Sequence, residues 1–559
     1  MRQKLRKWSR TGTPWIWINA GAVAISIVMV LGLLGVLAVN GLRHFWPNEV
    51  SHGRYLAPGF KPTELIGELT RTEWVPAEVL IASGLRVDPA QERYRRDLWK
   101  LGNRDLNGID FAWVLADFVE EVSTPENIAV FERKQGGVLY GAISSLELGE
   151  ESDPADALSD DQSLWAQFQS RLKEVRELDK QIQSIQSEQL ARANSDLERL
   201  GLRERAAMLE GELSPSLTQQ FSARRLEIQV ELANLQHQLN QLYAQIERDS
   251  VQVRASNSVE VLIPLAEIVR AYQPNNLTLA GKLSVYSQRL WEFLTAEPRE
   301  GNTEGGVYPA IFGTVVMVLL MSLFVTPFGV IAAVYLREYA KQGMTTRIIR
   351  VAVNNLAGVP SVVYGVFGLG FFVYLIGGEI DQLFYAEALP APTFGTPGLL
   401  WASLTLALLT VPVVIVATEE GLTRIPRSVR EGSLALGATK FETIWRVILP
   451  MASPAMMTGL ILAIARAAGE VAPLMLVGVV KLAPSLPVNG IYPYVHLDQQ
   501  FMHLGFHIYD VGFQSPNVEA ARPLVFATAL LLVSVIAILN LTAAVLRNRL
   551  RENFRSLEI

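Results

Sequence analysis

Two charged residues interrupt a long apolar segment near the end of the chain, and their types and spacing suit chemistry on an anion. Arg466 and Glu470 lie within residues 454–480, about 18 and 24 Å from the start of that segment if it is one helix. A charge at the centre of a bilayer costs about 2.5–3.5 kcal/mol on insertion scales. The spacing of four places both side chains on one helical face, where they can partly neutralise each other. Gly469 between them would let a neighbouring helix approach closely.

Two interpretations of this pair stay open. In one, it is a structural ion pair that locks helices together. In the other, it lines a path through the membrane, where Arg466 attracts an oxyanion and Glu470 gates or tunes that attraction. Asn354 and Asn355, near the inner end of the segment 351–378, are lesser candidates. Their amides would hydrogen-bond a passing anion, or else satisfy backbone carbonyls and bridge helices.

Several kinds of active site are excluded. The chain has no cysteine, which excludes disulfides and cysteine-ligated metals. The Gly-Lys pair at 281–282 lacks the earlier glycine and the following hydroxyl residue of a phosphate loop, so the chain cannot hydrolyse ATP itself. No HExxH, GxSxG or clustered metal-ligand set is present; His503 and His507 are predicted to lie in a solvated loop. The net charge of −6 argues against a nucleic-acid partner.

The elements that would position these residues are membrane helices. The chain has 559 residues, a mean hydropathy of +0.23 and only 19% charged residues. Its apolar residues gather in six segments long enough to cross a hydrocarbon core of about 30 Å. They are residues 15–40, 307–336, 351–378, 397–418, 454–480 and 523–546. The first exceeds the length of a cleavable signal and is predicted to be a retained anchor.

Lysine and arginine set the orientation of these helices. The segments 1–14, 337–350, 419–453 and 547–559 together hold 18 of them, whereas 379–396 and 481–522 hold two. The excess marks the cytoplasmic side. We therefore expect a cytoplasmic basic N-terminus (1–14), a cytoplasmic loop (419–453) and a cytoplasmic tail (547–559). Residues 41–306 would lie outside the membrane on the opposite side.

That external segment is predicted to be an α+β domain that carries a coiled-coil hairpin. Residues 112–123 have the pattern of an amphipathic helix, and 128–148 that of two strands around a Gly-Gly turn. Two heptad series fill 164–246, with a Ser-Pro-Ser break at 214–216 between them. Their members are Phe168, Leu172, Val175, Leu178, Ile182 and Ile185, then Ile228, Leu232, Leu235, Leu239, Leu242 and Ile246. The hairpin is either a spacer arm or a docking arm for an external partner.

The loop 419–453 contains an amphipathic stretch of its own, residues 431–450. Its apolar residues from Phe441 to Leu449 follow helical spacing, Gly437 separates them from a short preceding helix, and Pro450 is expected to end the helix. Two locations fit this pattern equally well. One is a groove on a protein partner, and the other is the headgroup region of the membrane.

This stretch resembles the EAA motif of ABC-importer permeases. The residues that carry the likeness are Glu431, Gly432, Ser433, Gly437, Ala438, Phe441, Leu449 and Pro450, with Gly432 and Ser433 where two alanines are usual. In that family the loop is the coupling helix that inserts into the ATPase subunit. The segments 359–373, 418–439 and 462–476 are similar to the phosphate-importer permease subunits usually called PstA. The resemblance covers roughly the last 255 residues and leaves out the external insert.

The resemblance implies a mainly α, polytopic helical membrane protein of the bacterial inner membrane, with six transmembrane helices and a permease domain over 307–546. It implies a translocation path past Arg466 and Glu470, and coupling through the loop 419–453. The partners implied are a homologous permease subunit (PstC-like), an ATPase dimer (PstB-like) that binds the ATP and magnesium, a periplasmic phosphate-binding protein (PstS-like) and membrane lipid. The chain itself is expected to need no cofactor. Two alternatives stay open: transport of another oxyanion such as sulfate or molybdate, and a signalling or scaffold role for the external coiled coil.

Overall fold

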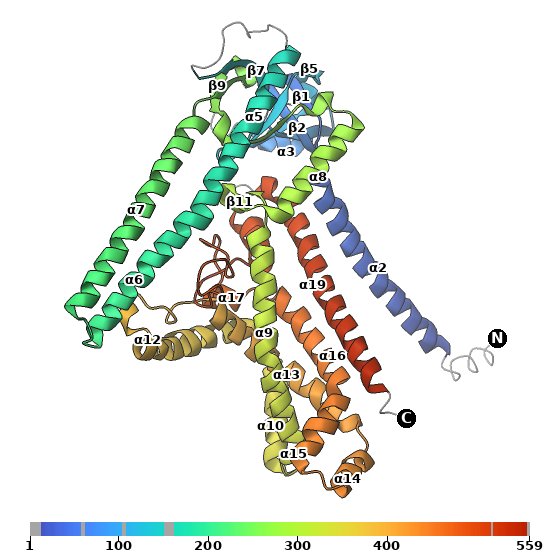
Figure 1. Cartoon of the computed structure of the whole chain (residues 1–559). Helices are drawn as coiled ribbons and strands as arrows, with labels where there is room; N and C mark the ends of the chain where they lie inside the picture. The colour runs from blue at the N-terminus through green and yellow to red at the C-terminus, as the bar shows by residue number, and fades with distance from the viewer. Residues whose placement is uncertain are drawn as a thin grey trace, which may run out of the picture.

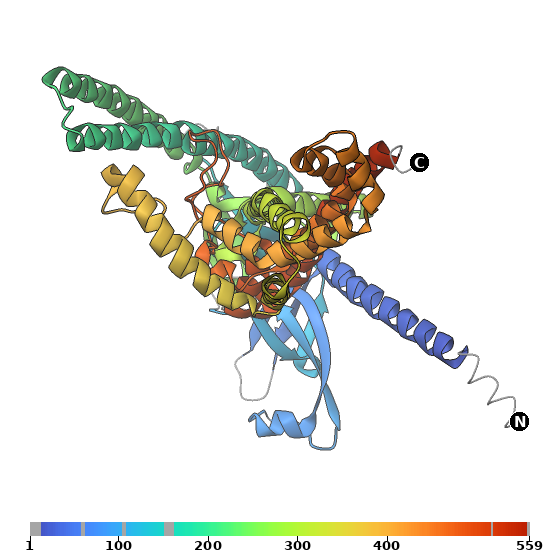
Figure 2. The ribbon, with the colours of Figure 1, turned by 90° about the horizontal axis from the view of Figure 1, so that it is seen from below.

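The molecule consists of a bundle of long helices, two small sheets above it and a long helical hairpin beside it (Figure 1). The computed structural model describes residues 13–56, 62–85, 87–102, 108–149, 161–515 and 518–555. Seen from below, the hairpin and the first sheet project from different sides of the bundle (Figure 2). Residues 1–12 and 556–559 of the predicted basic termini lie outside the described residues.

Within the described residues, six helices are long and apolar enough to cross a membrane, which confirms the number predicted. In the fold they correspond to α2 (Thr13–Arg43), α9 (Tyr308–Val334), α11 (Ser361–Phe367) continued by α12 (Gly378–Phe384), α13 (Leu399–Arg424), α16 (Leu449–Gly469) and α19 (Val518–Arg555). The membrane-crossing lengths of α9 and α16 include adjoining π-helical turns and run over Tyr308–Tyr339 and Lys440–Gly469.

The centre of the bundle is α13. Two thirds of the residues in its most apolar stretch are buried, whereas none are buried in the corresponding stretch of α2. Side chains of α9 (Met317, Met321) and α16 (Ala463, Ala467) pack on it in one apolar core. Where α16 crosses α13, a Cβ atom added at Gly459 would lie 2.6 Å from the Cβ of Ala417. The absence of a side chain at Gly459 therefore allows this close crossing.

The N-terminal helix α2 stands apart from this core. It touches α19 near its upper end, where a Cβ at Gly41 would lie 3.0 Å from the Cα of Ala527. Below that contact the two helices diverge (Figure 1). Most of the apolar surface of α2 therefore faces away from the described chain, and burying it requires lipid or another protein.

Two of the predicted spans have wrong bounds. Asn354 and Asn355 lie on a separate helix, α10 (Met344–Leu356), and the third span begins only at Ser361. Pro360 causes the break, because proline disfavours helical geometry at the residue before it and has no N–H to donate. The fifth span ends at Gly469 rather than near Val480. Beyond it the chain turns through the short helix α17 (Leu474–Val477).

Ten strands form two antiparallel five-stranded sheets, counted over the described residues. The first has the order β4-β3-β2-β1-β5 and the second β10-β6-β7-β8-β9. The first is built from β1 (Val50–Tyr55), β2 (Thr63–Pro76), β3 (Arg93–Lys100), β4 (Phe111–Leu115) and β5 (Val119–Ser123). The second is built from β6 (Ala129–Arg133), β7 (Val138–Glu147), β8 (Ser250–Arg254), β9 (Glu260–Pro264) and β10 (Ile268–Tyr272).

The helix predicted over 112–123 is wrong, because these residues form β4, a short turn and β5. Pairing with β3, in which Leu98 faces Trp113, buries Val114 and Leu115 and outweighs the helical spacing of the apolar residues. The two strands predicted within 128–148 are confirmed, since β6 and β7 pair around Gly136 and Gly137.

Shorter elements connect these parts. They are α3 (Ala77–Ala82), α8 (Leu279–Thr295), the two-residue strands β11 (Pro298–Arg299) and β12 (Glu304–Gly305), and α18 (Leu504–Tyr509). Ion pairs tie α8 to the second sheet and to β11: Arg289 Nε donates to Glu132 Oε1 of β6 at 2.9 Å, and Arg299 Nη1 of β11 donates to Glu292 Oε1 at 2.6 Å. These contacts fix the sheets to the segment that leads into α9.

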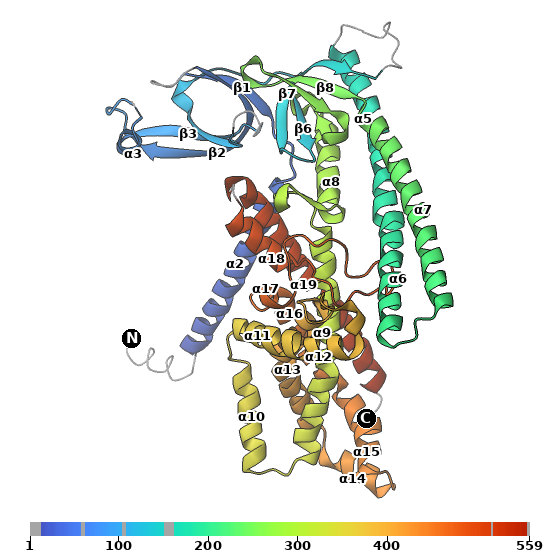
Figure 3. The same ribbon diagram turned by 90° about the vertical axis from the view of Figure 1, so that its left-hand side faces the viewer.

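The residues of the hairpin form α5 (Asp161–Ser184), α6 (Ala191–Leu209) and α7 (Pro215–Ile246). A π-helical turn joins α5 to α6, and the Ser214 hydroxyl caps α7 by accepting from Leu217 N at 3.3 Å. The two arms run beside the bundle (Figure 3). The end of α6 reaches the loops of the bundle, where Arg205 Nη1 donates to the carbonyl oxygen of Glu387 at 3.4 Å and the Arg199 guanidinium lies over the Tyr492 ring.

Candidate functional site

Two short helices form the lower tip of the bundle in Figure 1, α14 (Arg427–Ala435) and α15 (Lys440–Thr443). Gly437 makes the turn between them with a φ of +91°, a conformation that residues with a Cβ rarely adopt. Thr439 caps α15 reciprocally with Glu442 in a capping box. The Ser433 and Thr443 hydroxyls lie 2.9 Å apart, so the serine at a usual alanine position hydrogen-bonds one helix to the other.

The predicted end of this helix at Pro450 is wrong. From α15 the chain passes through a π-helical turn (Ile444–Ile448) and continues without interruption into α16. Proline lacks an N–H, and the wider π turn before it removes the need for the ordinary hydrogen bond at that position. Leu449 and Pro450 are half-buried and form the first turn of α16, so they do not belong to the exposed surface.

The tip exposes large apolar side chains. Leu436 is 90% exposed, Phe441 65% and Trp445 64%, and the rings of Phe441 and Trp445 stack with centroids 6.3 Å apart. Glu431 and Gly432 are exposed on α14, and Ala438 is half-buried in the turn. Single exposed hydrophobic residues are ordinary, but several within ten residues of one helical turn region indicate a contact surface. We call Leu436, Phe441 and Trp445 the tip surface.

The opposite face of these helices is firmly attached to the bundle. Ile444 and Ile448 are buried against Leu422 and Ile425. Arg430 Nη2 donates to Glu338 Oε1 at 3.0 Å and to the carbonyl oxygen of Leu422 at 2.7 Å. Force applied at the tip surface is therefore transmitted to α13 and α16.

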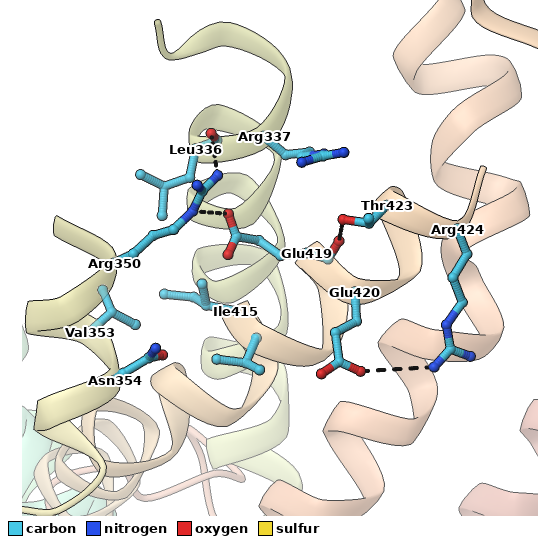
Figure 4. A pocket seen from close by; sticks show the side chains of 11 residues that line it. Leu336, Arg337, Arg350, Val353, Asn354, Ile415, Glu419, Glu420, Thr423 and Arg424 are labelled. Atoms are coloured by element: carbon cyan, nitrogen blue, oxygen red, sulfur yellow. Dashed lines mark hydrogen bonds and ion pairs between the residues drawn. The ribbon is translucent and has the colours of Figure 1, made fainter. Parts of the chain in front are cut away.

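A cavity of about 420 Å³ opens above the tip, between the lower ends of α9 and α13 and the C-terminal half of α10 (Figure 4). Arg350 Nε donates to Glu419 Oε1 at 3.1 Å, and Arg424 Nη2 lies 3.9 Å from Glu420 Oε2. Asn354 and Arg337 also line it. Three guanidinium groups against two carboxylates give the cavity one excess positive charge.

The predicted path residues do not all come together. Asn354 lines the cavity, whereas Asn355 is exposed outside its lining and its carbonyl oxygen accepts from Gly358 N at 3.0 Å. Arg466 and Glu470 do not line the cavity. The Tyr364 hydroxyl donates to the carbonyl oxygen of Leu356, the last residue of α10, at 2.7 Å.

Arg466 and Glu470 form an ion pair, with Arg466 Nε 3.5 Å from Glu470 Oε1 and side chains that are 32% and 21% exposed. They do not share a helix as predicted, because Glu470 is the residue after α16 and has extended geometry. Ala467 and Ala468 beside Arg466 belong to the apolar core with Met317 of α9, so the pair lies next to the bundle core. Gly469 does not mediate close packing, since an added Cβ would meet nothing within 4 Å.

Sequence reasoning missed most residues of the cavity: Arg337, Arg350, Glu419, Glu420 and Arg424. The arginines contributed to the charge count that set the orientation, but that count does not say which of them face one another. The signal available was the carboxylate pair 419–420 at the end of an apolar span, opposite the basic segment 337–350.

Two histidines near the upper end of the bundle are buried rather than solvated as predicted. His503 and His507 are 1% and 2% exposed, and neither His503 Nε2 nor His507 Nδ1 has a hydrogen-bond partner among the described residues. Burial lowers the pKa of both imidazoles to about 4; at His507 the Asp510 carboxylate opposes this and Lys481 reinforces it. No group of three potential metal ligands occurs in the described parts of the chain.

This burial predicts a pH-dependent stability. Between about pH 4 and 6.5 the unfolded chain binds protons at His503 and His507 that the folded chain does not, so the free energy of unfolding falls as the pH drops through that window. We expect a loss on the order of 2 kcal/mol per histidine between pH 7 and pH 5. Thermal unfolding of the full chain in detergent at both pH values measures it. His503→Gln and His507→Gln should each shrink the difference, and His237→Gln on the exposed face of α7 should not; equal differences in all variants would contradict the assignment.

Comparisons with known proteins give a consistent result. The family model for "Binding-protein-dependent transport system inner membrane component" matches residues 325–552. The "Phosphate transport system permease protein PstA 1" of Mycobacterium tuberculosis (strain CDC 1551 / Oshkosh) is 35% identical over 244 residues, 44% of this chain and 71% of that protein. The "Probable ABC transporter permease protein YqgI" of Bacillus subtilis is 28% identical over 262 residues, 46% of this chain and 83% of that protein.

Proposed function

Since this chain belongs to the family of binding-protein-dependent transport system inner membrane components, as a PstA-like ABC permease, we propose that it is a membrane subunit of an ATP-driven phosphate importer. The observation that carries the coupling part of this proposal is the tip surface. The side chains of Leu436, Phe441 and Trp445 are exposed to solvent. The helices that carry them are packed against α13 and α16. A groove on an ATPase subunit is the partner that suits such a surface.

The orientation follows from charge. The segments 1–14, 337–350, 419–453 and 547–559 hold 18 lysines and arginines, against two in 379–396 and 481–522. Since the tip belongs to 419–453, this count supports a cytoplasmic tip. The termini would then be cytoplasmic, and the sheets and hairpin of residues 41–306 periplasmic. The chain would be a multi-pass protein of the bacterial inner membrane.

The complex would contain three kinds of partner. A PstC-like permease subunit would supply the other half of the path, and a PstB-like ATPase dimer would bind ATP and magnesium below the tip surface. A PstS-like binding protein would deliver phosphate from the periplasmic side. The assignment of ATP binding to a partner subunit is supported by the sequence, which contains no phosphate loop.

Transport would proceed by alternating access. Closure of the ATPase dimer moves α14 and α15, and α13 and α16 move with them because Ile444 and Ile448 are packed into the same core. Arg466 would attract phosphate in the outward-open state, with Glu470 competing for the guanidinium, and Asn354 would stand at the inner cavity. The path releases phosphate only if its contacts differ between the two states.

Uptake of radiolabelled phosphate by cells that depend on this chain tests the proposal. Uptake that excess unlabelled phosphate blocks and excess sulfate does not supports a phosphate importer, whereas blocking by sulfate would assign another oxyanion. Purification from detergent should also recover an ATPase and a second permease. A stable homo-oligomer without an ATPase would overturn the proposal in favour of a scaffold role.

A further inference from the structure

The far end of the helical hairpin exposes large apolar side chains. Met208 and Leu209, the last two residues of α6, are 70% and 65% exposed, and Leu213 in the connection to α7 is exposed as well. Apolar side chains gathered at one end of an otherwise polar element indicate a contact with another protein or with a membrane. We call Met208, Leu209 and Leu213 the hairpin end.

Contacts between α6 and the loops of the bundle fix the level of the hairpin end. Arg205 Nη1 donates to the carbonyl oxygen of Glu387 at 3.4 Å, and Glu387 lies three residues beyond Phe384, where a membrane-crossing helix ends. The Arg199 guanidinium lies 5.1 Å from the centroid of the Tyr492 ring, in the loop 481–522. The helix α6 therefore meets the bundle where a span leaves the membrane. Its last residues follow one turn after Arg205, about 5 Å farther along the axis.

The end of α12 exposes apolar residues at the same level. Figures 1 and 3 show the hairpin running from the level of the sheets to that of α12. Leu383 and Phe384, the last residues of α12, are both 71% exposed. They belong to a helix long and apolar enough to cross a membrane, and the loop that follows them is the one that Arg205 contacts. The hairpin end thus reaches the height at which a membrane helix meets the headgroups.

The charges of the hairpin end determine how deep it can lie. Arg203 and Arg205 stand against Glu210 and Glu212, since Glu204 pairs with an arginine of α7. This balance gives no net attraction to anionic lipid, so burial of apolar surface has to supply the affinity. Glu210 and Glu212 are exposed in the same turn as the apolar residues. Carboxylates are costly in hydrocarbon, so the segment stays at the depth of the hydrated headgroups.

We propose that the hairpin end binds the lipid surface, with Met208, Leu209 and Leu213 buried in the outer leaflet beside α12. Apolar faces that lie in a membrane interface are buried about 5–10 Å into the boundary between headgroups and acyl chains. The other end of the hairpin continues from α7 into β8 of the second sheet. The hairpin is then a strut that supports the sheets on the membrane at a distance from the bundle.

Spin labels on single cysteines measure this contact, because the chain contains no cysteine of its own. The full chain, with the subunits that accompany it, is labelled at Met208→Cys or Leu209→Cys and reconstituted in phosphatidylcholine vesicles. Paramagnetic resonance then compares collisions of the label with oxygen, which concentrates in the membrane, and with a water-soluble nickel chelate. The unsubstituted chain, treated in the same way, gives the background from the other subunits.

Ala244→Cys is the matched control, because Ala244 is exposed on the same hairpin but lies near the sheet end of α7. It is about 44 Å from Pro215 along the helix axis. We expect the ratio of oxygen to nickel collisions to be several-fold higher at Met208 and Leu209 than at Ala244. All three sites are exposed, so the labels displace no packed side chain.

Two results would overturn the inference. Equal ratios at all three positions would mean that the hairpin end stands in water. Protection of Met208 and Leu209 from both reagents would mean that a protein subunit covers the hairpin end instead of lipid. The measurement does not depend on which solute the complex carries, so a failure of phosphate uptake would refute the proposed function and leave this contact to be decided by the labels.

Discussion

Gly437→Val is expected to reduce the amount of ATPase recovered with the purified chain by at least about tenfold, and phosphate uptake with it. The turn at Gly437 has a φ of +91°, which costs a β-branched residue on the order of 1–3 kcal/mol. We expect the variant to relieve this strain by rotating α14 against α15, which would move Leu436 relative to Phe441 and Trp445. Co-purification with ATPase quantified per mole of chain measures the loss.

The control for this variant is Gly343→Val. Gly343 lies at the same end of the bundle, precedes α10 with extended backbone geometry, and has only one atom, at 4.0 Å, near an added Cβ. Valine is therefore tolerated there, and ATPase recovery should match that of the unsubstituted chain. If Gly437→Val also recovers the ATPase in full, the tip surface is not the coupling surface.

Replacing Arg466 by methionine is expected to lower phosphate uptake by at least about tenfold, because an oxyanion in the path loses its charged hydrogen-bond donor. The same change leaves Glu470 without the partner that lies 3.5 Å away, and stability should fall on the order of 1 kcal/mol, since both side chains are partly exposed. Uptake assays and thermal unfolding of the same preparation measure the two effects separately.

The double variant Arg466→Met with Glu470→Gln decides what the pair is for. Removing both charges restores stability if the cost of the single change is the Glu470 carboxylate that it leaves without a partner. We expect stability to return and uptake to stay low. Recovery of both would mean that Arg466 serves only to neutralise Glu470. Arg549→Met, an exposed charge near the end of α19, is the control and should keep normal uptake.

Hydropathy predicted the number of membrane helices correctly because a run of about 20 apolar residues has few other stable locations. It did not predict where the helices end. Pro360 separated α10 from α11. Pro450, which follows a π turn, and Pro454 did not interrupt α16. Whether a proline breaks a membrane helix depends on the surrounding backbone and its neighbours, which local sequence does not specify.

The site was predictable to a similar degree. The pairing of Arg466 with Glu470 follows from their spacing, although Glu470 reaches its partner from beyond the end of the helix. The 420 Å³ cavity was not predictable, because Arg350 and Glu419 meet only through the packing of α10 on α13. The error at 112–123 has the same origin, since the partner strand β3 that favours β4 lies elsewhere in the sequence.

The helix from Lys440 to Gly469 runs without a break along α13, with close contacts at Gly459 and Ala417 and at Ala455 and Gly421. Ile444 and Ile448 are packed against α13 as well, so the two helices form one body from the tip upward. At 1.5 Å per residue, Phe441 and Arg466 lie about 38 Å apart on this single helix. A tilt of that body at the tip would therefore displace Arg466 directly, without any change of conformation in the chain between them.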